Sequence, residues 1–215
     1  MKQLLDVNNW ERKDQYQFFK QFDEPFFGVC VQVDVTQAYQ NAKAQNISFF
    51  LYYVYQSLVA ANSVESFRYR ISGDDVWVYD EIHASPTINR PNGTFGFAYF
   101  DYTTNFQQFL AQAQDEINKV QSTTGLIPAL SGENVIHYSS IPWINFTGLS
   151  HARAYSFPDS CPKISFGKMT EEGNRRLMPM SVHVHHALMD GFHVAQYIDR
   201  FQELLNGGPA LTPGP

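Results

Sequence analysis

The stretch from residue 181 to residue 193 contains the densest group of side chains that could transfer a proton. Its sequence, Ser-Val-His-Val-His-His-Ala-Leu-Met-Asp-Gly-Phe-His, holds four of the chain's seven histidines and one acid, Asp190. Imidazole is the side chain whose ordinary pKa suits proton abstraction near neutral pH. This stretch therefore points first to a general base.

A metal site is one alternative for the same residues. His183, His185, His186, Asp190 and His193 could all supply ligands. However, no cysteine pair lies near them in the sequence, and their order lacks the His-Glu-x-x-His pattern of helical zinc sites. The sequence therefore predicts a site without a metal.

Two elements of different periodicity flank the histidines. Residues 177–184 mix apolar with polar residues in near alternation, which predicts a buried strand. Further on, apolar residues recur at helical spacing until residues 206–208, at Val194, Tyr197, Ile198, Phe201, Leu204 and Leu205. The pair His185–His186 thus lies where a strand is followed by a helix, and Asp190–Gly191 is predicted to form a tight turn there.

A purely structural role is the second alternative, in which these histidines only cap and satisfy a buried turn. A single histidine would favour that role. Two adjacent histidines followed by Asp190 and Gly191, at a junction that can hold a side chain rigidly, favour proton transfer instead.

Residues 185–193 also resemble a known signature. His-His-Ala-Leu-Met-Asp-Gly-Phe-His is similar to the His-His-Ala-x-x-Asp-Gly-Phe-His motif of the chloramphenicol acetyltransferase family. A looser His-x-x-x-Asp-Gly form occurs in the acyltransferase core of 2-oxoacid dehydrogenase complexes. The resemblance implies that His186 deprotonates an acceptor hydroxyl, which attacks the thioester of acetyl-CoA directly, without an acyl-enzyme.

The beginning of the chain carries a second similarity. Residues 6–13, Asp-Val-Asn-Asn-Trp-Glu-Arg-Lys, resemble the family's opening Asp-x-x-x-Trp-x-Arg-Lys/Arg pattern. The resemblance implies a buried ion pair between Arg12 and Asp190 that supports the site. Residue type alone would instead favour a solvated arginine on a helix.

Two serine-containing segments carry further similarities. Spacing alone indicates ordinary turn residues in Ser139-Ser140-Ile141-Pro142-Trp143. The segment resembles the family's Ser-x-x-Pro-Trp stretch, which implies that Ser139 donates a hydrogen bond to the oxyanion of the intermediate. Residues 162–168 resemble the strand along the coenzyme A channel. The candidate substrate and coenzyme A contacts are Ser165, Lys168, Phe19, Phe95 and Thr87.

The acceptor side departs from the family pattern. Asp23 and Glu24 stand where family members have mainly apolar residues. Chloramphenicol is neutral and largely apolar, so carboxylates near it would weaken its binding or admit another acceptor. The expected function is acetyl-CoA-dependent O-acetylation of chloramphenicol. The alternatives are acyl transfer to another hydroxyl or thiol, and a non-enzymatic small-molecule binder on the same fold.

The length of the chain and the order of its predicted strands and helices restrict the possible architecture. The 215 residues suit a single domain, which we place at residues 1–206, followed by a flexible tail at 207–215. Strands and helices alternate irregularly with hairpins, which favours an α+β fold. The resemblance specifies a two-layer sandwich of a mixed β-sheet packed with helices.

The expected elements in chain order follow from periodicity and turn residues. They are a short extended entry and helix at 6–22, a strand at 26–35, a helix capped by Thr36 and ending at 44, a core helix at 49–61, a hairpin at 68–79, strands at 87–89 and 94–102, a helix at 105–120 and a loop at 125–134.

Charge and cysteine content restrict partners and compartment. The net charge is −6 with acids and bases interspersed, which argues against nucleic-acid binding and a polybasic membrane anchor. No apolar stretch is long enough to span a bilayer, and the two cysteines suggest no disulfide framework. We expect a soluble cytoplasmic protein, and the resemblance implies a homotrimer with active sites at its subunit interfaces.

Overall fold

The computed structural model describes residues 1–126, 132–155 and 158–207. The strands are β1 (Lys2–Leu4), β2 (Phe26–Asp34), β3 (Tyr69–Ser72), β4 (Asp75–Tyr79), β5 (His83–Asn89), β6 (Phe95–Phe97), β7 (Val135–Ser140), β8 (Lys163–Phe166), β9 (Thr170–Glu172) and β10 (Arg175–His185). The helices are α1 (Lys13–Phe19), α2 (Thr36–Ala44), α3 (Phe49–Ser63), α4 (Phe106–Ser122) and α5 (Gly191–Gly207), with short 3₁₀ helices at Val7–Asn9 and Glu65–Arg68.

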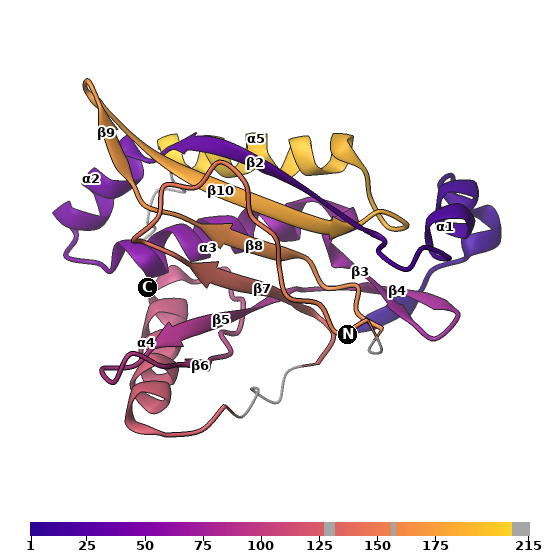
Figure 1. Ribbon diagram of the computed structural model, residues 1–215, viewed down its shortest axis with the longest axis horizontal. Helices are drawn as coiled ribbons and strands as arrows, with labels where there is room; N and C mark the ends of the chain where they lie inside the picture. The colour runs from indigo at the N-terminus through magenta and orange to yellow at the C-terminus, as the bar shows by residue number, and fades with distance from the viewer. Residues whose placement is uncertain (127–131, 156–157, 208–215) are drawn as a thin grey trace.

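A mixed seven-stranded sheet forms the centre of the fold. Its order is β2-β10-β8-β7-β5-β6, with β9 paired to β10. The pairs β5–β7 and β7–β8 are parallel, whereas β10 is antiparallel to both of its long neighbours. Figure 1 shows α3 and α5 behind this sheet, while the segment from residue 141 to residue 155 crosses its front. This arrangement confirms the predicted α+β sandwich of a mixed sheet packed with helices.

The helix-covered face of the sheet is the hydrophobic core. Helix α3 is apolar on nearly all sides, as expected for a helix buried between a sheet and other helices. The hydroxyl oxygen of Ser57, near the middle of this helix, lies 2.7 Å from both Tyr138 Oη on β7 and Tyr197 Oη on α5. The buried polar groups of three elements thus satisfy one another, which fixes how α3 and α5 sit on the sheet.

The alternation along β10 decides which side chains face away from that core. Met180, Val182 and Val184 are fully buried on the helix side, so the intervening Ser181 and His183 point to the front face. The His183 ring lies against Gly28 of β2, where a Cβ would come within 2.3 Å of its Nε2. The absence of a side chain at Gly28 therefore makes room for this imidazole.

Several boundaries differ from the prediction. Thr36 is the first residue of α2 rather than its cap, because Asp34 Oδ1 accepts hydrogen bonds from the backbone N–H and hydroxyl of Thr36. The predicted strand 94–102 is limited to β6, although Ala84 and Phe100 still form an isolated bridge.

The predicted tight turn at Asp190–Gly191 is shifted toward the N-terminus. The chain turns at residues 186–188, and α5 begins at Gly191 because Asp190 Oδ1 accepts the N–H of Phe192. Asp190 therefore caps the helix. The predicted tail beyond Gly207 lies outside the described residues, as does part of the predicted loop 125–134.

No helix in the described parts of the chain combines the length and the apolar character that crossing a membrane would require.

Candidate active site

The turn that follows β10 presents His186. Its backbone N–H donates to Pro25 O at 2.8 Å, and the N–H groups of Leu188 and Met189 both donate to His185 O. His186 Nδ1 lies 3.2 Å from Met189 O. A carbonyl oxygen can only accept, so Nδ1 carries the proton in this contact. Nε2 is then left with a free lone pair, as a general base requires.

Two aromatic rings fix the plane of the His186 ring. Phe19, at the end of α1, stacks on it with ring centres 3.8 Å apart and an interplanar angle of 12°. Phe27 of β2 packs against it at 4.6 Å. The base therefore lies in a partly apolar setting, and Phe19, a predicted substrate contact, touches the base directly.

Asp190 is held by three partners at the start of α5. Arg12 Nη1 lies 2.5 Å from Asp190 Oδ2, and His193 Nδ1 lies 2.9 Å from Oδ1, which also accepts the Phe192 N–H. Burial alone would raise the pKa of Asp190. The hydrogen bonds from Arg12 and His193, with the charge of Arg12, outweigh that effect and lower the pKa to about 2.

The Arg12–Asp190 pair is only partly buried. The Arg12 side chain is 14% exposed and that of Asp190 is 38% exposed. Arg12 Nη2 also lies 3.4 Å from His186 O, so the guanidinium touches both ends of the turn. The implied ion pair is therefore present at the turn, but it is more exposed than the family resemblance implied.

Ser139 belongs to a line of hydroxyls across the sheet, which we call the hydroxyl row. Strand register places Ser139 of β7 beside Ser165 of β8, and Ser165 beside Ser181 of β10. All three face the front of the sheet. Ser140 points the other way, with its Oγ 2.8 Å from Tyr53 Oη on the helix side. Ser165 is fully buried, and its Oγ has no hydrogen-bond partner within the described ranges.

A single chain does not bring His186 and Ser139 together. Ser139 is two strands away from Ser181, and His186 lies five residues beyond Ser181. Strand geometry separates the two residues by roughly 15–20 Å. The predicted base and the predicted oxyanion donor are therefore at different places on one chain.

A cavity of about 580 Å³ opens at the carboxyl ends of β7 and β8. Its lining includes the predicted contacts Thr87 and Lys168, together with Tyr53, Ser140 and Gly167. Its volume is within the range of small-molecule sites, about 300–1,000 Å³. The predicted contact Phe95 lies on β6 with 43% of its surface exposed, and its role stays a prediction.

The two acids of the acceptor segment have different surroundings. Glu24 Oε1 accepts the N–H of Phe26 and lies 3.4 Å from Arg153 Nη1. Asp23 lines a second cavity of about 380 Å³, together with Arg153 and Asp159. Glu24 is therefore partly neutralised, while Asp23 faces a space that a ligand could enter.

A basic row, missed in the sequence, runs beside the hydroxyl row. Register aligns His137 of β7 with Lys163 of β8, and Lys163 with His183 of β10. Lys163 forms an ion pair with Asp159. No local motif could have revealed this row, because its members come from separate strands and meet only through register.

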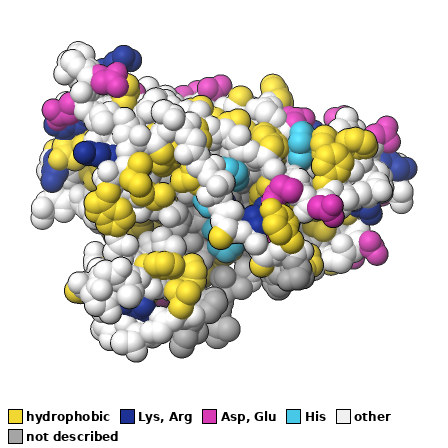
Figure 2. All heavy atoms as spheres, viewed as in Figure 1, with side chains coloured by type: hydrophobic (Ala, Val, Ile, Leu, Met, Phe, Trp, Pro, Cys, Tyr) yellow, Lys and Arg dark blue, Asp and Glu magenta, His cyan; other side chains and the backbone are white. Residues whose placement is uncertain are grey.

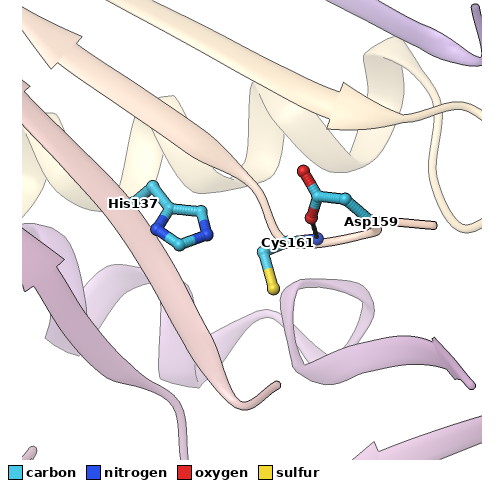
Figure 3. A group of neighbouring side chains, drawn as sticks. All are labelled: His137, Asp159 and Cys161. Carbon is cyan, nitrogen blue, oxygen red and sulfur yellow. Dashed lines mark hydrogen bonds between the residues drawn. The ribbon is translucent and has the colours of Figure 1, made fainter. Parts of the chain in front are cut away.

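His137, Asp159 and Cys161 come close together near this row (Figure 3). One potential ligand atom from each lies within 4.8 Å of the others. However, the Asp159 carboxylate is paired with Lys163, and the Cys161 thiol donates to Glu133 O at 3.2 Å. These contacts, with an ammonium group at the same carboxylate, favour a polar wall of side chains over a metal site.

Comparison with known proteins shows the family of the chain. The family model described as "Chloramphenicol acetyltransferase" matches residues 2–202. Chloramphenicol acetyltransferase 3 of Escherichia coli is 30% identical over 204 residues, which cover 94% of this chain and 96% of that protein. The chloramphenicol acetyltransferase of Campylobacter coli is 28% identical over 94% of this chain and 97% of its own.

Solved structures of acetyltransferases are also similar to this chain. A chloramphenicol acetyltransferase superposes with a TM-score of 0.88 at 31% identity, covering 95% of this chain and all of that one. The dihydrolipoamide acetyltransferase of Azotobacter vinelandii has a TM-score of 0.67 at 16% identity, covering 94% of this chain and 89% of that one, and so shares the fold. This chain belongs to the chloramphenicol acetyltransferase family of acyltransferases.

Proposed function

We propose that this protein transfers the acetyl group of acetyl-CoA directly to a hydroxyl of chloramphenicol. The observation that carries the proposal is the state of the His186 imidazole. Its Nδ1–H donates a hydrogen bond to Met189 O, so its Nε2 is free to accept a proton. Family membership over nearly the whole chain supports the same donor and acceptor.

The chemistry needs one base and one oxyanion donor. His186 Nε2 takes the proton of the acceptor hydroxyl as its oxygen attacks the thioester carbonyl. Ser139 donates a hydrogen bond to the oxyanion of the tetrahedral intermediate. When the intermediate collapses, the carbon–sulfur bond breaks, and the imidazolium returns its proton to the leaving thiolate. The products are the acetyl ester and coenzyme A.

Asp190 and Arg12 support this chemistry without touching the acceptor. Their ion pair fixes the start of α5 and the carbonyl of His186. This positions the imidazole without a proton relay through the carboxylate, whose pKa of about 2 keeps it ionised.

Acetyl-CoA is assigned to the 580 Å³ cavity at the carboxyl ends of β7 and β8. The mainly apolar walls suit a pantetheine arm. The exposed ammonium group of Lys168 lies at this cavity and can pair with a phosphate. Thr87 adds a hydroxyl to the same wall, and Ser165 lies beside Ser139 near the reacting carbonyl.

The active protein is proposed to be a cytoplasmic homotrimer of a single domain, residues 1–206. The distance between His186 and Ser139 within one chain supports an assembly, because each active site then combines the base of one copy with the oxyanion donor of another. A cyclic trimer forms three such identical sites.

The test is the His186→Ala variant in a thiol-release assay with acetyl-CoA and chloramphenicol. We expect kcat to fall by about 10²–10⁴, the usual contribution of a general base, with an unchanged far-UV circular dichroism spectrum. His185→Asn is the matched control, because an Asn oxygen can replace Nδ1 as acceptor for the N–H of Ala187.

A larger loss in His185→Asn than in His186→Ala would contradict this assignment. The same assay with other hydroxyl acceptors and with dihydrolipoamide tests the alternative acyl transfers. A chain that binds chloramphenicol but releases no thiol with any acceptor would be a binding protein.

A further inference from the structure

The two substrates must reach Ser139 from opposite directions. The cavity assigned to acetyl-CoA opens beyond Ser139, at Ser140 and at Gly167–Lys168. In direct transfer, the acceptor oxygen attacks the thioester carbonyl while coenzyme A still occupies its own cavity. The acceptor therefore extends toward the amino ends of β7 and β8, and what lies there decides which acceptor fits.

The basic row occupies that position. His137 and Lys163 each precede the hydroxyl row by two residues on the same face of the sheet, which places them about 7 Å from Ser139 and Ser165. An acceptor with its hydroxyl at Ser139 must therefore pass over His137 and Lys163.

This part of the wall is ionic, yet its charges compensate each other. Lys163 and Asp159 form an ion pair, with side chains only 11% and 21% exposed. Burial would raise the pKa of Asp159, but the charge and hydrogen bond of Lys163 lower it instead. Burial, assisted by Lys163, lowers the pKa of His137 to about 4. At neutral pH the wall thus presents a carboxylate, an ammonium group and a neutral imidazole.

A second compensated pair extends the same surface. Arg153 lies 3.4 Å from Glu24 Oε1 and 3.6 Å above the ring of Phe26. The 380 Å³ cavity connects Arg153 and Asp159 with Asp23 and with His185, the neighbour of the base. Figure 2 shows histidine side chains at the surface near the middle of this face, beside acidic and basic side chains.

We propose that the acceptor half of this site prefers a polyhydroxylated, sugar-type alcohol over an apolar aromatic acceptor. A hydroxyl both donates and accepts, so it can bridge Asp159 and Lys163 without adding charge. An apolar ring at the same place removes water from the ion pair and gives no hydrogen bond in return.

This inference rests on the proposed function, since it keeps the same base, donor and reaction. One sugar O–H bond and the carbon–sulfur bond of acetyl-CoA break, and an acetate ester and the thiol of coenzyme A form. His186 carries the proton from the hydroxyl to the thiolate.

The experiment compares kcat/KM for chloramphenicol with that for methyl glucoside, methyl galactoside and methyl mannoside, measured by thiol release from acetyl-CoA. We expect at least one glycoside to exceed chloramphenicol about tenfold. In the double variant Asp159→Leu/Lys163→Met, we expect kcat/KM for that glycoside to fall at least tenfold. The KM for chloramphenicol should fall, and the KM for acetyl-CoA should not change.

Glu171→Gln/Arg176→Met is the matched control, because it removes an ion pair of similar type between β9 and β10. It should leave both acceptors unaffected. His137→Leu, a single neutral substitution in the basic row, replaces the double variant if the latter does not fold, and the same loss is expected.

Two results separate the inference from the function on which it rests. Chloramphenicol preferred over all three glycosides would overturn the inference and leave acetyl transfer intact. If acetyl-CoA binds but none of the acceptors, chloramphenicol included, leads to thiol release, the proposed function itself is overturned.

Discussion

The turn that holds His186 and the row that holds Ser139 are built in opposite ways. The turn is local, because His186, Met189, Asp190 and His193 lie within eight residues and bond mainly to one another. The hydroxyl row joins three strands whose members meet only through register. One half of the site is therefore set by a contiguous sequence, and the other by the whole sheet.

The two halves also differ in how many of their polar groups have hydrogen-bond partners within one chain. Asp190 has three hydrogen-bond partners, and His186 is held by a carbonyl and two aromatic rings. In the hydroxyl row, by contrast, Ser165 Oγ has no partner in the part of the chain that the structure describes. The polar groups of the turn thus find partners within one chain, some of them outside the turn, such as Arg12 and Pro25, whereas the row is open to a substrate or a second copy.

At the row, a large effect on the reaction rate is expected. Ser139→Ala should lower kcat by about 10²–10³, the usual cost of removing one oxyanion donor, with little change in thermal stability. Ser140→Ala is the comparison, because Ser140 faces Tyr53 on the opposite side and lines the cavity assigned to acetyl-CoA, so its loss should change the KM for acetyl-CoA rather than kcat. Steady-state kinetics on both variants decide the matter. Equal losses of kcat would show that the front face of β7 does not carry the donor.

As the pH falls, protonation of buried histidines on the front face should reduce the stability of the fold before protonation of the turn does. Burial lowers the pKa of His137, His151 and His185 to about 4 each, below the value of about 6.5 in an unfolded chain. The unfolded state then binds more protons, so stability is full above pH 6.5 and is lost as pH falls toward 4. After discounting for partial exposure, we expect about 1 kcal/mol per imidazole.

Thermal denaturation between pH 7 and 4 measures this loss. His151→Gln should flatten the curve between pH 6.5 and 4, since the buried Nε2 of His151 has no partner within the described ranges. Asp190, whose folded pKa is about 2, should contribute its loss only below about pH 4. If stability falls with pH as steeply in His151→Gln as in the wild type, protonation of His151 does not contribute to the acid sensitivity.

A smaller effect on stability is expected at the turn. Asp190→Asn should reduce the free energy of unfolding by about 1–2 kcal/mol, less than for a buried pair because Asp190 is 38% exposed. The melting temperature should fall by roughly 2–8 °C for a chain of this size, and activity should fall with it. The pair Arg200–Glu203, exposed on the same helix, supplies the control Glu203→Gln. Lost activity at an unchanged melting temperature would mean that Asp190 takes part in the chemistry.

The local half of the site was predictable from sequence. The strand before His185 and the helix after Asp190 follow from periodicity over a short stretch, whereas the choice of His186 among the histidines was implied by the family pattern. The contact between Arg12 and Asp190 was implied by the family pattern alone, because residue type favours a solvated arginine. The position of the turn itself was misjudged, since a helix-capping aspartate and a turn aspartate give the same local sequence.

The nonlocal half was not predictable in the same way. A shift of one residue in β8 would replace Ser165 and Lys163 with core residues on the front face, and no local feature of that strand fixes its register. The basic row and its partner Asp159 therefore emerged only from the folded sheet. The acids at Asp23 and Glu24 were visible, but Arg153, which neutralises Glu24, is far away in sequence.

The most direct test of a site built from two copies is complementation between inactive variants. His186→Ala and Ser139→Ala chains are co-expressed with different tags, and doubly tagged oligomers are assayed for thiol release from acetyl-CoA. In the proposed cyclic trimer, every doubly tagged oligomer has one interface of three at which one copy supplies His186 and its neighbour supplies Ser139, so about a third of the wild-type sites should be restored. Mixed oligomers no more active than the two parent variants would show that the base and the donor must come from the same chain, which would contradict this account.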